Sequence, residues 1–289
     1  YWSMQNGKIG VEPLSDFDDE VWYAGARDTG AEYITDPFIY EVQGTPVLMT
    51  SLVFPILIDG EFIGIVSSDM ALDSLQEMVS QVNTSGLGEY TEVYSNSGLI
   101  VAHPDDAFFN RSVYITSAYN MLISERGKVG QALEIAEAYV EHTTTQSDEN
   151  EDKAIEHDNA AAFLDNLTEF SSGASGVGLD MNLLTDGLAR EILQLDKDRL
   201  RIAEDATAAI ADGEAYTVTE DCYYKVYMPI YFSEVTNPWS VAVNVPMSAV
   251  MKAADDIRNY VLLICVISIA VIALVIYLVS KPITNPILS

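Results

Sequence analysis

Side chains that could catalyse a reaction or hold a metal are few in this sequence, and their spacing suits neither role. His103, His142 and His157 lie far apart and show no metal-ligand spacing. Ser175 lies in a stretch that approaches the nucleophile-elbow pattern, but Val177 stands where that pattern needs its last glycine. No Walker loop or dinucleotide fingerprint is present. The sequence therefore predicts no enzyme, no cofactor and no metal.

Two groups of acidic residues remain as candidates for binding chemistry. The run at 146–152 lacks the glycine and glutamate positions of a regular calcium loop, so it is typical of a solvated loop. Asp73 begins a capping-box-like helix start that ends at Gln76. Asp69, four residues earlier at the end of a predicted strand, has no such capping role and remains a candidate.

The composition limits the class of protein. The chain has 289 residues, 44 Asp and Glu against 14 Lys and Arg, and a net charge of −30. An apolar content of 49% is enough for folded domains. The acid excess repels phosphate backbones, so nucleic acid is excluded as a partner. Cys222 and Cys265 give no disulfide framework, since the second lies in an apolar run.

That apolar run, at 260–279, predicts a transmembrane helix. It contains no charge, and Ser268 is its one residue outside the apolar set. About 20 residues at ~1.5 Å each span one hydrocarbon thickness of ~30 Å. The alternative, a buried helix of a soluble domain, would normally have a polar stripe. Tyr260 and Tyr277 lie where interfacial aromatic residues belong.

The chain before this run is predicted to form antiparallel hairpins and helices. Strands 51–58 and 61–66 flank Asp59-Gly60, a strong hairpin turn signal. Further hairpins are predicted at 90–94 with 99–103, at 223–231 with 239–245, and around Asn6-Gly7. Residues 117–212 have helical periodicity and many acids, which indicates a helical insertion.

Several motifs, in this order, resemble the double Cache sensing domain of bacterial chemoreceptors, over most of residues 1–116 and 214–259. In the first module they are Val21-Trp-Tyr-Ala-Gly-Ala26, Thr35-Asp-Pro-Phe38, Leu52-Val-Phe-Pro-Ile56, Asp59-Gly60 and Gly64-Ile-Val-Ser-Ser-Asp-Met-Ala-Leu72. In the second they are Ser97-Gly-Leu-Ile-Val-Ala-His-Pro-Asp105 and Pro238-Trp-Ser-Val-Ala-Val243. The resemblance implies an α+β fold of two PAS-like antiparallel-sheet modules.

The resemblance also implies the domain organisation. The expected parts are a membrane-distal Cache module over 1–85, a membrane-proximal module over 86–245 with the insertion at about 117–212, a connecting helix over 246–259, the transmembrane helix over 260–279 and the start of a HAMP linker over 280–289. Since family members begin with a transmembrane helix and a long ectodomain helix, we expect the chain to be truncated at its N-terminus. Lys252 and Arg258 precede the span and only Lys281 follows it, so the count of basic residues by itself favours a cytoplasmic N-terminal part. The HAMP linker that the resemblance implies is cytoplasmic, however, and places residues 1–259 outside the cell.

The family's amino-acid receptors resemble one another in an Arg-x-Trp-Tyr motif that holds the ligand carboxylate. A Tyr and an Asp follow in the next turn, and an Asp at the end of a later strand holds the ligand amine. Trp22 and Tyr23 match this motif, and Asp69 matches the amine-holding residue. The remaining three positions depart from the pattern: Glu20 replaces the Arg, Phe38 the Tyr and Tyr40 the first Asp.

The departures reverse the charge that the site prefers. A ligand carboxylate at about 4 Å from Glu20 would be repelled by roughly 4 kcal/mol at an effective dielectric of 20, and a cation would be attracted equally. The aromatic rings add cation–π attraction, and Asp69 adds a counter-ion. We therefore expect a cationic amine without an α-carboxylate as the ligand, such as a polyamine, a biogenic amine or a quaternary ammonium compound.

Other roles are open for these residues. Trp22 and Tyr23 could pack the core, Asp69 could accept hydrogen bonds in a turn, and Glu20 could face solvent. Arg27, in the next helical turn, could replace the missing Arg and restore amino-acid binding.

The predicted function is the sensory region of a methyl-accepting chemotaxis receptor in the cell membrane, acting as a homodimer with cytoplasmic signalling partners. One alternative places the same sensor on a histidine kinase or a diguanylate cyclase. Another is a membrane-anchored structural or adhesive protein without a ligand. The helix after Pro246 runs into the span, so a rearranged sheet would move the transmembrane helix.

Overall fold

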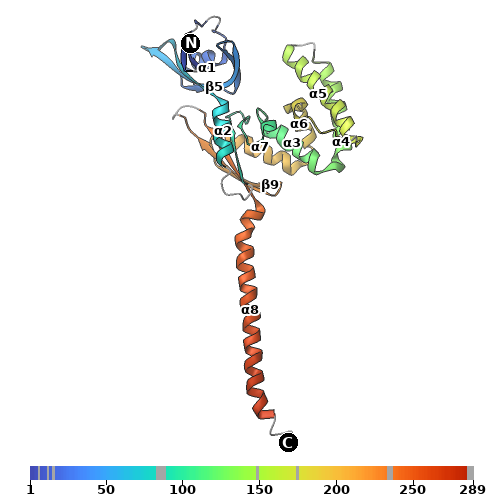
Figure 1. Cartoon of the computed structure of the whole chain (residues 1–289). Helices are drawn as coiled ribbons and strands as arrows, with labels where there is room; N and C mark the ends of the chain where they lie inside the picture. Colours follow the sequence, from blue (N-terminus) through green and yellow to red (C-terminus); the bar gives the residue numbers. More distant parts are fainter. Residues whose placement is uncertain are drawn as a thin grey trace.

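The computed structural model describes residues 1–5, 7–11, 13–14, 17–82, 89–147, 150–173, 176–232 and 237–284. Two antiparallel sheets follow each other along the molecule, a lobe of helices lies beside the second sheet, and one long helix leads from it toward the C-terminus (Figure 1). This arrangement confirms the predicted α+β fold with a helical insertion and an apolar C-terminal helix.

The secondary-structure elements follow the chain in a simple order. They are β1 (Trp2–Gln5), β2 (Lys8–Val11), α1 (Val21–Thr29), β3 (Tyr33–Ile34), β4 (Phe38–Val42), β5 (Thr45–Ile58), β6 (Glu61–Ala71), α2 (Leu72–Val82), β7 (Tyr90–Tyr94), β8 (Ile100–Ala102), α3 (Val113–Ser124), α4 (Val129–Thr144), α5 (Glu151–Ser171), α6 (Asp186–Leu193), α7 (Lys197–Asp212), β9 (Tyr216–Glu220), β10 (Tyr223–Ile230), β11 (Trp239–Pro246) and α8 (Met247–Thr284), with short 3-10 turns at Asp106–Phe108, Arg126–Lys128 and Met181–Leu183.

The distal sheet is built on the long strand β5, which pairs with β3 and β4 along one edge and with β6 along the other. Asp59 and Gly60 form the β5–β6 turn with φ angles of 51° and 83°, as the Asp-Gly pair predicts. A bulge between Ile56 and Leu57 shifts the register of this hairpin by one residue. A separate ribbon of β1 and β2 closes around Gly7, and the expected turn residue Asn6 lies outside the described residues.

Helix α1 covers one face of the distal sheet. Trp22 and Ala26 on α1 pack against Val53 of β5, and all three are buried. The helix ends at Gly30, whose φ of 62° is the left-handed conformation that glycine adopts at helix ends.

The proximal sheet has the strand order β8-β7-β11-β10-β9 and is covered on both faces. Helix α2 packs on the face that carries Trp239, and helices of the lobe pack on the face that carries Tyr94 and Tyr227. The cluster around Trp239 also includes Ile34 and Leu72, so the two sheet modules share one apolar core.

Four of the five helices of the lobe, α3 to α7, start at side-chain caps, and α4 does not. Ser112 caps α3, Asn150 caps α5, Thr185 caps α6 and Asp196 caps α7. The loop expected through 152 therefore ends at Asn150, and the next two acids form the first turn of α5, where negative charge complements the helix dipole. Residues 148–149 and 174–175 of the expected loops lie outside the described residues.

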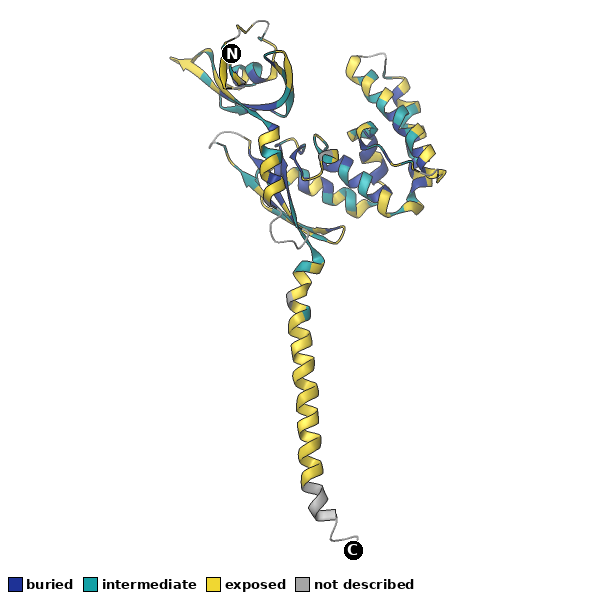
Figure 2. Cartoon of the chain, in the orientation of Figure 1, coloured by how far each residue is buried: buried dark blue, intermediate teal, exposed yellow. Residues whose placement is uncertain are grey.

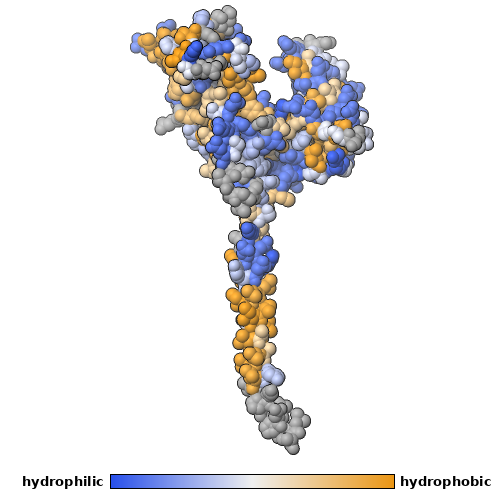
Figure 3. Space-filling model, in the orientation of Figure 1, coloured by the Kyte–Doolittle hydropathy of each residue, from blue (hydrophilic) through white to orange (hydrophobic). Residues whose placement is uncertain are grey.

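The helix α8 is continuous from the end of the proximal sheet. Most of it is exposed, except that Met247, Ala249 and Asp255 near its start are half-buried, and its lower part is apolar (Figures 2 and 3). Among the described residues it is the one helix long and apolar enough to cross a membrane, over Met247–Leu278. The helix includes the first part of the expected HAMP linker, and 285–289 lie outside the described residues.

Candidate functional site

A small cavity lies between α1 and the distal sheet. Its volume is about 20 Å³, which is room for roughly one water-sized group. The side chains that line it are Tyr1, Leu14, Trp22, Phe38, Tyr40, Ser51, Ser67 and Asp69. Four predicted candidates, the three aromatic residues Trp22, Phe38 and Tyr40 together with Asp69, therefore meet at one cavity.

The strand register explains why these side chains meet. Asp69 of β6 lies directly opposite Ser51 of β5, and Phe38 and Tyr40 of β4 lie opposite Met49 and Val47. Because alternate residues of a strand point to the same face, positions 47, 49 and 51 bring their partners to one face of the sheet. This is the face that α1 covers.

The cavity has one acidic group inside aromatic walls. The Ser51 hydroxyl donates a hydrogen bond to Asp69 Oδ1 at 2.5 Å, which fixes the carboxylate. Asp69 brings the one formal negative charge among the described side chains that line the cavity. The ring centroids of Phe38 and Tyr40 lie 6.4 Å apart, and the indole of Trp22 is 7% exposed. A carboxylate beside aromatic faces suits an ammonium group.

The structure does not bring Glu20 or Tyr23 to this cavity. Glu20 is exposed and lies at the N-cap position of α1, without a side-chain capping bond. Tyr23 is half-buried and packs edge-on against Phe17 and Phe62, with centroid distances of 4.8 and 5.6 Å. The packing role considered for Tyr23 and the solvent-facing role considered for Glu20 match these positions.

Arg27 also lies away from the cavity lining. Its guanidinium pairs with the Asp28 carboxylate at 2.8 Å and donates to the Asp18 carbonyl at 2.7 Å. The hydrogen bond to Asp28 raises the pKa of Arg27, so the guanidinium stays protonated, and its positive charge is balanced by nearby Asp residues. In this structure Arg27 does not stand in for the arginine that Glu20 replaces.

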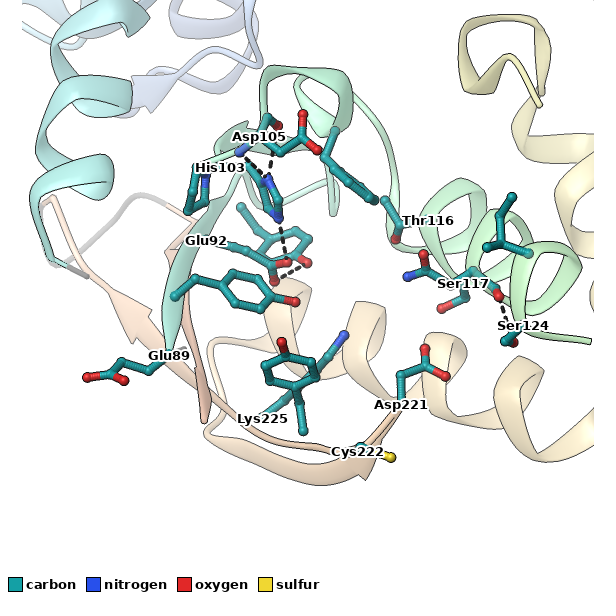
Figure 4. Close-up of a pocket in the computed structure, with 17 residues that line it drawn as sticks. Glu89, Glu92, His103, Asp105, Thr116, Ser117, Ser124, Asp221, Cys222 and Lys225 are labelled. Carbon is teal, nitrogen blue, oxygen red and sulfur yellow. Dashed lines mark hydrogen bonds and ion pairs between the residues drawn. The ribbon is translucent and has the colours of Figure 1, made fainter. Parts of the chain in front are cut away.

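A second and much larger cavity lies in the proximal module, between the sheet and α3 (Figure 4). Its volume is about 660 Å³, within the range of small-molecule sites. Glu92 and Lys225 rise from the sheet, His103 comes from the end of β8, and Thr116 and Ser117 face them from α3 (Figure 4).

Buried polar groups form a network on the floor of this cavity. Glu92 is 5% exposed; the Tyr94 hydroxyl donates to its Oε2 at 2.8 Å, and His103 Nε2 lies 3.4 Å from its Oε1. Lys225 Nζ donates to Glu220 Oε2 at 3.2 Å. Burial raises the pKa of Glu92, but the contact with His103 and the charge of Lys225 outweigh that effect, so the pKa lies below its ordinary value.

This network predicts a loss of stability in acid. A carboxyl group whose pKa is lowered by folding stabilises the folded state above its unfolded pKa, and the contribution disappears as the pH falls through the folded value. The free energy of unfolding of the unchanged chain should fall as the pH drops below about 4.5, the ordinary pKa of a glutamate. In Glu92→Gln this fall should be smaller, because the titrating carboxyl group is absent. Denaturant titrations at a series of pH values measure this. Tyr94→Phe, which removes one donor, should give a smaller change of the same sign; an unchanged acid profile for Glu92→Gln would contradict the prediction.

The proximal cavity was not predicted from the sequence. Its residues come from separate elements, and each one alone resembles an ordinary surface or core residue. In the distal cavity Ser51 and Ser67 were not among the predicted residues, although Ser67 shares with Asp69 the two-residue spacing of one strand face. Within the described parts of the chain, no group of three or more His, Cys, Asp or Glu side chains could hold a metal ion.

Comparisons with known proteins agree with the distal fold. Residues 2–77 match the family model of the first PDC sensor domain of methyl-accepting chemotaxis protein-like proteins. The chain is 33% identical over 89 residues to the methyl-accepting chemotaxis protein TlpQ of Pseudomonas aeruginosa, covering 30% of this chain and 12% of that protein. It is 32% identical over 87 residues to McpA of Pseudomonas putida, covering 29% and 13%. The chain therefore spans about one eighth of these relatives.

A solved structure is similar over most of the chain. The extracellular domain of mmHK1S-Z3, described as a histidine kinase, has a TM-score of 0.50 at 21% identity and covers 89% of this chain and 64% of that one. This likeness concerns the fold alone. The resemblance to Cache sensors is confirmed by the PDC match, and the matching model describes a sensor domain and no catalytic family.

Proposed function

We propose, from the premise that residues 2–77 are a PDC sensor module of the chemoreceptor type, that this chain is the ligand-binding sensory region of a transmembrane chemoreceptor. Its sheet modules would lie outside the cell and α8 would cross the membrane. The family match and the apolar length of α8 support this arrangement.

The proposed ligand of the distal cavity is a small cationic amine without an α-carboxylate. The observation that carries this proposal is the Asp69 carboxylate, held by Ser51 among the rings of Trp22, Phe38 and Tyr40. No arginine or lysine is among the described side chains of the lining, so a ligand carboxylate would have no cationic partner there. At about 20 Å³ the cavity accepts only the ammonium head without side-chain movement.

The signal would pass from the sheets to α8 by direct connection. Strand β11 ends at Pro246 and α8 begins at the next residue. The Met247 N–H donates to the carbonyl of Cys222, in the β9–β10 turn, at 2.7 Å. The apolar core shared by both modules joins the distal sheet to β11. A change in the distal cavity could therefore shift the start of α8 by the small displacements known for such helices.

The proposed output is chemotaxis, because the family model and both relatives at over 30% identity are methyl-accepting chemotaxis proteins. A HAMP linker that begins at residue 280, within the last turns of α8, a homodimer and cytoplasmic signalling partners belong to the same proposal. A histidine kinase or a diguanylate cyclase would carry the sensor in the same way, and the sequence beyond 289 separates these outputs.

Isothermal titration of the chain in detergent micelles tests the ligand class. Putrescine and L-ornithine are a matched pair, since ornithine is putrescine with an added α-carboxylate. Putrescine should bind and ornithine should bind at least ten-fold more weakly, because its carboxylate would lie near Asp69 without a cationic partner. Tighter binding of ornithine than of putrescine would overturn the amine proposal.

A further inference from the structure

The large proximal cavity offers hydrogen-bond donors that the protein leaves unused. The Lys225 ammonium has three donors, and among the described residues its one hydrogen bond is to Glu220. Asn244 is 0% exposed, and neither atom of its amide has a partner in the described part of the chain. In the sheet register Asn244 lies between Tyr90 and Lys225, and both of these neighbours line the cavity. Asn244 itself does not line the cavity, so the remaining donors of Lys225 are the ones that suit a ligand carboxylate.

The charge of Lys225 is secure. Burial opposes its ammonium form, but the electrostatic effects of Tyr227, Glu92 and Glu220 outweigh burial and raise its pKa above the ordinary lysine value. The ammonium is therefore available as an anion anchor at physiological pH.

The neighbouring carboxylate attracts a cation but offers it little hydrogen bonding. Both oxygens of Glu92 already have partners within the protein, Tyr94 and His103. Aromatic rings surround this part of the cavity: the centroid of Tyr90 lies 5.4 Å from His103 and 5.3 Å from Tyr223. A buried carboxylate with one partner on each oxygen, beside aromatic faces, attracts a cation by its charge, and a cation without N–H groups needs no further acceptor there.

The other acids of the lining do not compete for this cation. Both oxygens of Asp221 are held by the Arg199 guanidinium, at 2.8 and 2.5 Å. Asp105 accepts from the Ala107 N–H at 3.0 Å and is exposed. Glu89 lies at the edge of the cavity, and its carboxylate points away from Glu92 and Lys225 (Figure 4). Glu92 and Lys225 are therefore the two charges that a ligand would meet inside.

These two opposite charges select a ligand without net charge. Among the lining side chains, an ammonium ligand alone would face Lys225, and a carboxylate ligand alone would face Glu92. We propose that the proximal cavity is a second ligand site, distinct from the distal cavity, and that it binds a small betaine, a zwitterion with a quaternary ammonium and a carboxylate. The carboxylate would lie against Lys225 and the methylated ammonium between Glu92 and the aromatic rings.

The site adjoins the start of α8. Cys222 and Tyr223 line the cavity; the carbonyl of Cys222 accepts from the Met247 N–H at 2.7 Å, and Tyr223 pairs with Pro246. Asp221 and Cys222 form this turn with φ angles of 49° and 66°. Such positive φ angles are tolerated by Asp but are uncommon for a residue such as Cys222. A betaine bound here would contact the turn that holds the first residue of the long helix.

Titration of the full chain with four related probes tests the proposal. The probes are glycine betaine, glycine, which has N–H groups in place of the methyl groups, choline, which lacks the carboxylate, and acetate, which lacks the ammonium. Asp69→Asn, in the distal cavity, is included in every sample so that amine binding there does not contribute. Glycine betaine should bind at least ten-fold more tightly than each of the other three. No binding of glycine betaine, or equal or tighter binding of any other probe, would overturn the proposal.

Two variants locate the binding. Lys225→Met should lower the affinity for glycine betaine at least ten-fold. This change removes the hydrogen-bond partner of Glu220 and leaves it, among the described residues, only the Arg199 contact at 4.0 Å, so a second variant without a charge change is needed. Phe108→Leu, at a half-buried lining position, removes an aromatic face and should lower the affinity about three-fold or more. Far-ultraviolet circular dichroism checks the folding of each variant. Unchanged affinity in a folded variant at either position would overturn the site, whereas putrescine binding to the unmodified chain tests the distal cavity separately.

Discussion

Asp69→Asn is expected to abolish most of the binding of cationic amines to the distal cavity. Asparagine has the shape of aspartate and still offers an oxygen to the Ser51 hydroxyl, so the change removes the charge and little else. A hydrogen bond to a charged group contributes about 1.5–3 kcal/mol, which corresponds to roughly 10- to 150-fold in the dissociation constant of putrescine. Isothermal titration measures the loss, and thermal unfolding without ligand checks that the module is intact.

Glu20→Gln is the matched control for this experiment. It removes the same charge from an exposed residue that does not line the cavity. A surface charge at this distance is screened by solvent and salt, so the affinity should change less than about two-fold. If Glu20→Gln weakened putrescine binding as much as Asp69→Asn, the ligand would lie at the N-terminus of α1 and the distal cavity would not be the site.

Trp239→Ala is expected to cause the largest loss of stability of any single change considered for this chain. Trp239 is 1% exposed and packs in the cluster that joins the two modules, 5.3 Å from the ring of Phe232. Truncation of a buried tryptophan costs about 3–5 kcal/mol, because apolar contacts are lost and a cavity remains. Denaturant unfolding should show this loss, and the distal and proximal modules should no longer unfold together, since Ile34 and Leu72 lose their common partner.

Trp239→Phe controls for the aromatic character of the position. Phenylalanine keeps most of the contacts, so its loss should be clearly smaller than that of alanine. A loss below about 1 kcal/mol for Trp239→Ala would mean that the shared cluster does not hold the modules together, and the proposed route from the distal sheet to α8 would lose its basis.

Much of the fold could be predicted because its signals are local. Asp59-Gly60 adopts positive φ angles at both positions, as this residue pair predicts, and the strands on either side pair as expected. The apolar run at 260–279 forms part of a single helix, since about 20 residues without charge or polar stripe allow few other structures. In both cases neighbouring residues are sufficient to specify the backbone.

The sequence by itself therefore determined the hairpins, the sensor resemblance and the apolar helix, while the tertiary structure decided which side chains meet. If β5 and β6 paired without a bulge from the Asp59-Gly60 turn onward, Asp69 would lie opposite Thr50. The bulge between Ile56 and Leu57 shifts the pairing by one residue, so Asp69 lies opposite Ser51 and on the face that α1 covers. A one-residue shift moves every side chain to the other face of a strand, and no local pattern reports it. The proximal cavity depends on Glu92, Lys225 and the wall of α3, which are far apart in the chain, because burial and proximity arise only when separate elements pack together.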